Sequence, residues 1–141
     1  MSVNTYSAKK VSVIVGGIPM HGFTEDSVVM IEQSAEAFKM LVGADGEVGR
    51  SYNPDRSGKI TIHLNNYSDS NDVLSGLAIA DAATLIGTFP VMVKDNNGTT
   101  LAASAEAWIS KIPNTEFKRE IGQREWVIEC AQLQYYAGGS F

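Results

Sequence analysis

Hydrophobic and polar residues alternate most regularly at residues 59–65, with the sequence KITIHLN. Ile60, Ile62 and Leu64 occupy every second position, and the residues between them are polar or charged. This period of two is typical of a β-strand with one face toward a core and the other toward solvent. The pattern therefore predicts a half-buried strand between two polar segments.

Residues 27–33, SVVMIEQ, carry apolar side chains on both faces of a predicted strand. Val29 and Ile31 lie on one face, and Val28 and Met30 lie on the other. A strand of this kind is expected to be covered on both faces. Because a domain of this size has a small interior, the excess apolar surface predicts burial against other copies of the chain.

One segment, at about residues 71–86, has the period of an α-helix. Ser70 or Asn71 can cap its start, since a short polar side chain accepts a hydrogen bond from a free N–H of the first turn. Gly87 is suited to end it. The side chains expected on its buried face are Leu74, Leu77, Ala78 and Leu85.

The other segments read mainly as strands and turns. Residues 37–43 favour a strand over a short helix, and the turn sequence Asn96-Asn97-Gly98 predicts a hairpin between two strands. In the last strand the inward positions shift, which predicts either a bulge near Ala131 or burial on both faces. Six or seven strands and one helix predict a mainly β fold, a small β-barrel or sandwich with the helix packed on it.

The chain of 141 residues is expected to form a single domain, residues 1–141, with a long loop or hairpin protruding at about residues 43–58. Eleven Lys and Arg residues against sixteen Asp and Glu residues give a net charge of −5, which disfavours a firm grip on nucleic acid. No apolar run approaches the roughly 20 residues that a membrane-spanning helix needs, so we expect no membrane association.

Catalytic and metal-binding patterns are missing from the sequence. The two histidines, His21 and His63, have no partner at the spacing of a metal site, and a solvated His63 is the expectation. Cys130, the single cysteine, is expected to be a small core residue. We therefore predict neither an enzyme nor a cofactor-binding protein.

Four elements follow one another within residues 42–77, VGADGEVGRSYNPDRSGKITIHLNNYSDSNDVLSGL. They are a Gly-x-Asp-Gly loop, a basic and serine-containing turn, an alternating G-x-I-T-x-x-L strand and an S-x-S-N-x-x-L helix start. In this order they resemble the inner tail tube proteins of contractile-tailed bacteriophages, a fold that type VI secretion tube proteins share.

The resemblance implies a β-barrel with a flanking helix, and hexameric rings stacked into a hollow tube that conducts phage DNA without binding it specifically. The implied partners are other copies of the chain and the tail sheath, baseplate and tail terminator proteins. The implied location is the virion tail, after assembly in the host cytoplasm. A type VI secretion tube component and, as a third reading, a small β-barrel binding module are the alternatives.

Two sets of residues are expected to serve such an assembly. The protruding loop is charged but has no catalytic pattern, so we predict that it contacts the next ring through Asp45, Arg50, Asp55 and Arg56. The polar faces of two strands are expected to face either the channel or the sheath. The candidates for the channel wall are Glu125, Glu129, Thr61 and His63.

Overall fold

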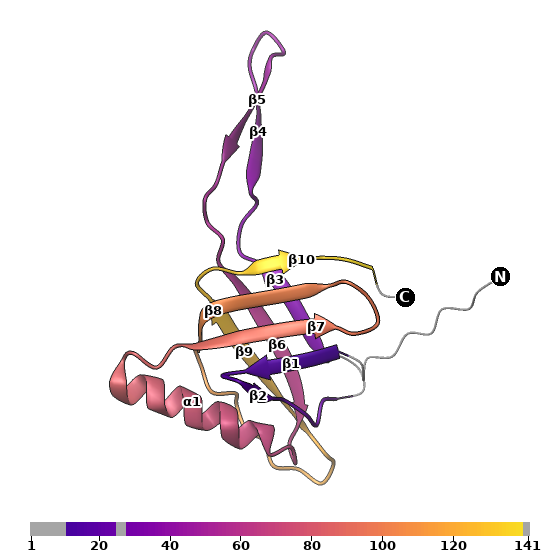
Figure 1. The fold of residues 1–141 in the computed structure, drawn as a ribbon, viewed down its shortest axis with the longest axis vertical. Helices are drawn as coiled ribbons and strands as arrows, with labels where there is room; N and C mark the ends of the chain where they lie inside the picture. The colour runs from indigo at the N-terminus through magenta and orange to yellow at the C-terminus, as the bar shows by residue number, and fades with distance from the viewer. Residues whose placement is uncertain (1–10, 25–27, 140–141) are drawn as a thin grey trace, which may run out of the picture.

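The computed structural model describes residues 11–24 and 28–139, which form ten strands and one helix (Figure 1). The strands before the helix are β1 (Val11–Val15), β2 (Ile18–Pro19), β3 (Val29–Gln33), β4 (Phe38–Val42), β5 (Val48–Tyr52) and β6 (Gly58–Asn65). They are followed by α1 (Ser70–Thr84), β7 (Phe89–Asp95), β8 (Leu101–Ile109), β9 (Gln123–Cys130) and β10 (Gln134–Tyr136).

Most of the strands belong to one antiparallel sheet with the order β2-β1-β7-β8-β9-β6-β3, and β10 pairs with β8. The sheet folds over so that β1, β7 and β8 form one layer and β9, β6 and β3 form the other (Figure 1). The predicted mainly β fold with one flanking helix is confirmed, as a sandwich. The barrel alternative is wrong, because β2 and β3 end the sheet without pairing with each other, and six or seven strands was too low a count for the described residues.

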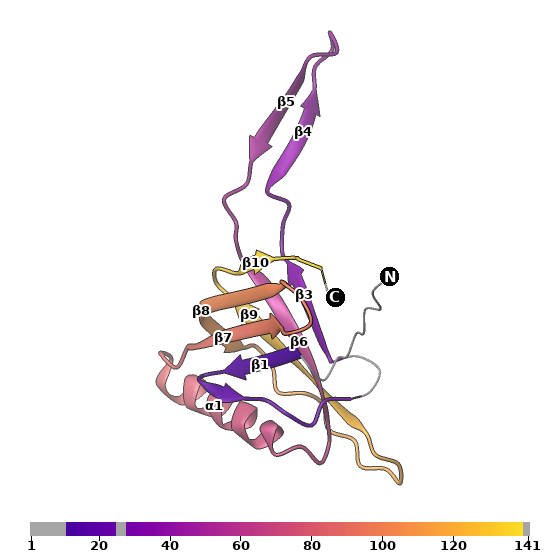
Figure 2. The ribbon, with the colours of Figure 1, turned by 45° about the vertical axis from the view of Figure 1, so that its right-hand side comes forward.

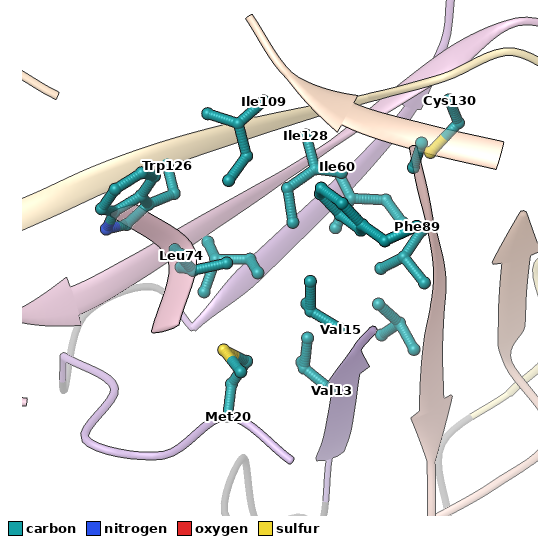
Figure 3. Packing of buried hydrophobic residues seen from close by; sticks show 14 of the residues in the cluster. Val13, Val15, Met20, Ile60, Leu74, Phe89, Ile109, Trp126, Ile128 and Cys130 are labelled. Atoms are coloured by element: carbon teal, nitrogen blue, oxygen red, sulfur yellow. The ribbon is translucent and has the colours of Figure 1, made fainter. Parts of the chain in front are cut away.

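The core lies between the two layers (Figure 3). The alternation in β6 is confirmed, since Ile60, Ile62 and Leu64 are fully buried. The opposite layer contributes Val13, Val15 and further valines, and Trp126 is the largest fully buried side chain. Cys130 is buried among them, as predicted.

The prediction that residues 27–33 are covered on both faces is wrong for the subunit. Val29 and Ile31 pack against the core, whereas Met30 is exposed. The reason is that the sandwich has two layers: the inner face of β3 meets the core between them, and Met30 on the outer face stays 51% exposed. Residue 27 lies outside the described residues.

The helix begins one residue before its predicted start, and neither Ser70 nor Asn71 caps it. Asp69 is the N-cap residue, without a hydrogen bond from its side chain to the helix. Asn71 instead joins three elements. Its Nδ2 donates to the backbone oxygens of Asn65 and Ser68, and its Oδ1 accepts a hydrogen bond of 2.8 Å from Trp126 Nε1.

The predicted buried face of the helix is correct for Leu74, Leu77 and Ala78 and wrong for Leu85. The helix ends at Thr84, and Leu85 adopts a left-handed conformation with φ of 63°, which turns its side chain into solvent. Gly87 is not the capping residue. Its N–H donates to Asp81 Oδ1, which fastens the chain after the helix.

Leu74→Ala is expected to lower the free energy of unfolding by about 2–5 kcal/mol, because it empties space in a closed core. Leu74 is fully buried, and its side chain lies near Trp126 in Figure 3. Ile79→Ala on the same helix is the control, since Ile79 is 62% exposed and its loss should cost about 0.5 kcal/mol or less. Urea unfolding measures both, and equal effects would contradict the packing of α1 described here.

The structure tests two local predictions. The chain turns at residues 96–98, where the Gly98 N–H donates to the backbone oxygen of Asp95. An irregular segment, residues 131–133, separates β9 from β10 and contains the buried Leu133. Cys130 and Leu133 are both buried, so the inward positions do shift near Ala131. The shift comes from an interruption of the predicted long strand and not from a bulge, because the pairing with β8 keeps one register from Cys130 opposite Ala107 to Gln134 opposite Ala103.

Candidate assembly surfaces

Strands β4 and β5 form a hairpin that stands away from the body of the molecule (Figures 1 and 2). They make a separate two-stranded sheet and pair only with each other. The turn is closed by a hydrogen bond from Gly43 N–H to the oxygen of Glu47, and Gly46 has the positive φ of 83° that such a turn requires. The protrusion thus starts at Phe38, five residues earlier than the sequence indicated.

One face of this hairpin is strongly apolar. In the register Phe38 lies opposite Tyr52, Met40 opposite Arg50, and Val42 opposite Val48. We call this the apolar hairpin face; its members are Phe38, Met40, Val42, Val48, Arg50 and Tyr52, and all are exposed. The other face carries Lys39, Leu41 and Ser51. An apolar surface of this size on a thin protrusion is typical of a contact site for another protein.

The side chains of the apolar hairpin face are held in place by one another. The rings of Phe38 and Tyr52 are 5.3 Å apart, and the guanidinium carbon of Arg50 lies 4.2 Å from the centre of the Phe38 ring. A cation over an aromatic face is an attractive arrangement. These contacts hold the three side chains against one another on the apolar hairpin face.

The charged residues predicted to contact the next ring bind mostly within their own loop. Asp45 Oδ1 accepts from Glu47 N–H, and Arg56 Nη2 donates to the Tyr52 hydroxyl at 3.1 Å. Asp55 accepts hydrogen bonds from the side chain and backbone of Ser57, which lower the pKa of its carboxyl group. These three side chains shape the base and tip of the hairpin, and only Arg50 lies on the apolar hairpin face.

Sequence reasoning missed the apolar hairpin face. The alternation at Phe38, Met40 and Val42 was visible in the sequence, but it was attributed to an ordinary strand of the body. The second strand, VGRSY, gives a weak signal because Gly49 and Ser51 fall between its larger residues. Only the pairing of the two strands shows that the larger residues share a face.

The four candidates for the channel wall lie on one surface of the body. Strands β6 and β9 are neighbours, with His63 opposite Glu125 and Lys59 opposite Glu129. These positions alternate with the buried Ile60 and Ile62, so they point away from the core. We call this the outer β6–β9 face; its members are Lys59, Thr61, His63, Glu125, Val127 and Glu129.

The outer β6–β9 face is acidic at its exposed positions. His63 Nε2 lies 3.7 Å from Glu125 Oε2, and the glutamate side chain is 59% exposed whereas the histidine is mostly covered. Thr61 has a relative exposure of only 6%, so it adds little surface. With the neighbouring Glu32 and Lys111 included, this face and its margin carry three carboxylates and two lysines.

The described part of the chain shows neither a metal cluster nor a reactive cysteine. No group of three or more His, Cys, Asp or Glu residues within it could hold a metal ion. Burial raises the pKa of the Cys130 thiol, which keeps it protonated and poorly reactive. The single described helix is too short and too polar to cross a membrane.

Comparison with known proteins assigns the family. The sequence profile of the family described as "Bacteriophage PhiTE tail tube protein" matches residues 4–138. The chain belongs to the phage tail tube family. A relative, "Structural protein ORF10" of Pseudomonas phage KPP10, is 34% identical over 145 residues, covering 97% of this chain and 84% of that protein. The tail tube resemblance is thereby confirmed, and this chain is a structural protein and not an enzyme.

Solved structures with this fold come from contractile injection systems. A chain of the PVC sheath–tube complex, in its extended state, has a TM-score of 0.62 at 13% identity and is matched over 94% of this chain and 92% of its own. A chain of the anti-feeding prophage cap, which terminates the tube, has a TM-score of 0.59 at 11% identity, with 96% and 94% covered. At these identities the likeness shows a shared fold.

Proposed function

We propose that this tail tube protein assembles with copies of itself into hexameric rings, and that the rings stack into the inner tube of a phage tail. The observation that carries the proposal is the hairpin, whose apolar face has no partner within the described part of the subunit. A two-stranded hairpin is only marginally stable alone, so this one requires a surface that another subunit can provide. The exposed edge of β3 offers a further place for strand pairing between subunits.

The family and the shared fold support the proposed partners and location. Solved relatives in fold come from a sheath–tube complex and from a sheath/tube terminator, so tail sheath and terminator proteins are the proposed neighbours of this chain, with the baseplate at the far end. Assembly takes place in the host cytoplasm, and the finished tube is part of the virion.

The outer β6–β9 face is the proposed wall of the channel. Its carboxylates, the exposed Glu125 and the half-buried Glu129, repel phosphate, and a ring repeats them in every subunit. DNA in transit then meets a wall that does not hold it, because firm binding needs clustered lysine and arginine. The channel conducts DNA without specific binding.

Purified protein without sheath or baseplate is expected to form rings or tubes as its concentration rises from micromolar to millimolar. Head-to-tail contacts that close on rotation produce rings, and the same contacts repeated along an axis produce tubes. Sedimentation velocity measures the size, and negative-stain microscopy shows the shape. A protein that stays monomeric across this range would refute the proposed self-assembly.

A further inference from the structure

The outer face of β1, β7 and β8 is hollowed by a groove with a volume of about 960 Å³. Its lining is largely small or apolar: Ile14, Gly17, Pro90, Met92, Ala103, Ala105 and Ala131 take part, with Glu106, Gln132 and Gln134 among the polar residues. We call it the β7–β8 groove. It lies on the layer opposite the outer β6–β9 face, so it belongs to neither surface discussed so far.

The groove is an apolar sheet face that the subunit does not cover. Ile14 lies opposite Met92, and Met92 lies opposite Ala103, so the three side chains form a row across the strands. The alternate positions, Val13 and Val93 among them, point into the core. The row therefore faces outward, where a layer of this composition is expected to pack against another element.

We propose that the β7–β8 groove receives the apolar hairpin face of a second copy of the chain. This inference rests on the proposed self-assembly and names the surface on which the hairpin docks. The hairpin projects away from its own body in both views, so it does not reach the groove of the same subunit (Figures 1 and 2). The occupant must come from another molecule.

The two surfaces are complementary in shape. The hairpin presents large side chains, among them Phe38, Met40 and Tyr52, on a narrow two-stranded ribbon. The groove has small residues, Ala103 and Ala105, where such side chains would enter. Large side chains that fill a hollow lined by small ones give the dense packing on which stable interfaces depend.

The charges are complementary as well. Arg50 is the one charged residue of the apolar hairpin face, and Glu106 is the one charged residue that lines the groove. Within the described part of the chain Glu106 forms no ion pair. A docked hairpin brings a guanidinium to this carboxylate and leaves no charge buried alone, which would be costly.

The proposed contact propagates. Each subunit carries one hairpin and one groove, and these surfaces differ, so the interface is head-to-tail and leaves one unused hairpin and one unused groove on every pair. Such contacts close into a ring if the rotation closes, and otherwise continue along an axis as a stack.

Cross-linking tests the contact directly. The double variant Met40→Cys/Ala103→Cys, assembled and treated with a short bis-maleimide, is expected to give a ladder of covalent oligomers. An equal mixture of the two single variants should stop at dimers, because each subunit then has one reactive end. The parent chain is the background control, since its only cysteine, Cys130, is buried and has a raised thiol pKa.

A control variant combines Met40→Cys with a cysteine outside the groove. Phe117 lies on the long connection between β8 and β9 and is 88% exposed. This connection reaches the end of the molecule opposite the hairpin (Figure 2). Met40→Cys/Phe117→Cys should give no ladder. Met92→Cys replaces Ala103→Cys if the latter does not fold.

Each outcome decides between the proposals. Assembled tubes with a ladder only from the groove pairs support the docking site. Tubes that give no ladder, a ladder from the Phe117 pair alone, or a groove cysteine that still reacts with a maleimide dye after assembly would overturn it. The last result would leave the groove to a different protein. In all three cases the proposed tube function would stand, whereas a strictly monomeric parent chain would overturn both.

Discussion

A chain in which Ser34 is joined to Ser57 through an Asn-Gly turn is expected to fold as the native body does and to form no stacked tubes. The Ser34 N–H donates to the backbone oxygen of Ser57, so β3 and β6 already approach each other there as in a hairpin. An Asn-Gly turn suits such a connection. The removed segment contains β4 and β5, which pair only with each other and leave the body sheet intact.

Circular dichroism and urea unfolding would show whether this body is native, and sedimentation velocity would show whether it assembles. Normal tubes from a folded, shortened chain would mean that the hairpin serves another purpose. A shortened chain that does not fold would be replaced by point variants of the full hairpin, which test the same idea.

Met40→Asp and Leu41→Asp form the matched pair for that test. The two residues are adjacent and both exposed, at 67% and 56%, but they lie on opposite faces of the hairpin. Met40→Asp places a carboxylate on the apolar hairpin face and is expected to abolish assembly, because burying an unpaired charge is very costly. Leu41→Asp should leave assembly nearly unchanged. Equal effects would contradict a specific role for the apolar hairpin face.

The second large effect is expected in the channel. The double variant Glu125→Lys/Glu129→Lys should assemble normally but slow DNA ejection by about tenfold or more, because lysines on the wall bind passing phosphates. The three carboxylates and two lysines on and beside the outer β6–β9 face become one carboxylate and four lysines. Raising the salt concentration should restore ejection, since screening weakens this binding.

The control is Glu116→Lys/Glu120→Lys, which makes the same change of net charge on the exposed connection between β8 and β9. Virions carrying each variant would be compared by electron microscopy for tail assembly and by the rate of DNA release. If both variants release DNA at the parent rate, or both slow it equally, the outer β6–β9 face does not line the channel.

The sequence correctly predicted those elements whose apolar residues are buried within the subunit itself. The alternation of Ile60, Ile62 and Leu64 reports a single buried face, and β6 has that face buried. The helix was placed to within a residue or two, but Leu85 was assigned to the wrong face. Helical periodicity cannot reveal that the chain leaves the helix at Thr84 by a left-handed residue.

The family could be recognised because several residues of the resemblance have structural roles. Ser68 Oγ donates to the backbone oxygen of His21 and accepts from Ser70 N–H, and Asn71 links the start of α1 to β6 and β9. The spacing of such residues is set by the geometry of one junction, so it is visible in one sequence.

The surfaces proposed for assembly were harder to predict, because their apolar residues would be buried only by another molecule. Met30 and Met40 look like core residues in the sequence, yet both are exposed in the subunit. The apolar residues of β3 and β4 therefore suggested a larger hydrophobic core than one subunit has. This excess of exposed apolar residues is one reason to expect self-association.

The separation of the hairpin from the body sheet bears on how fast tubes can begin to form. A two-stranded ribbon without tertiary support gains most of its stability on docking. The first few subunits must therefore order their hairpins before a complete docking site exists, whereas later subunits add to a site that is already formed. Polymerisation of this kind is expected to show a lag and a critical concentration, and to start readily from an existing end. Free subunits would then persist until an existing end presents the first docking surface.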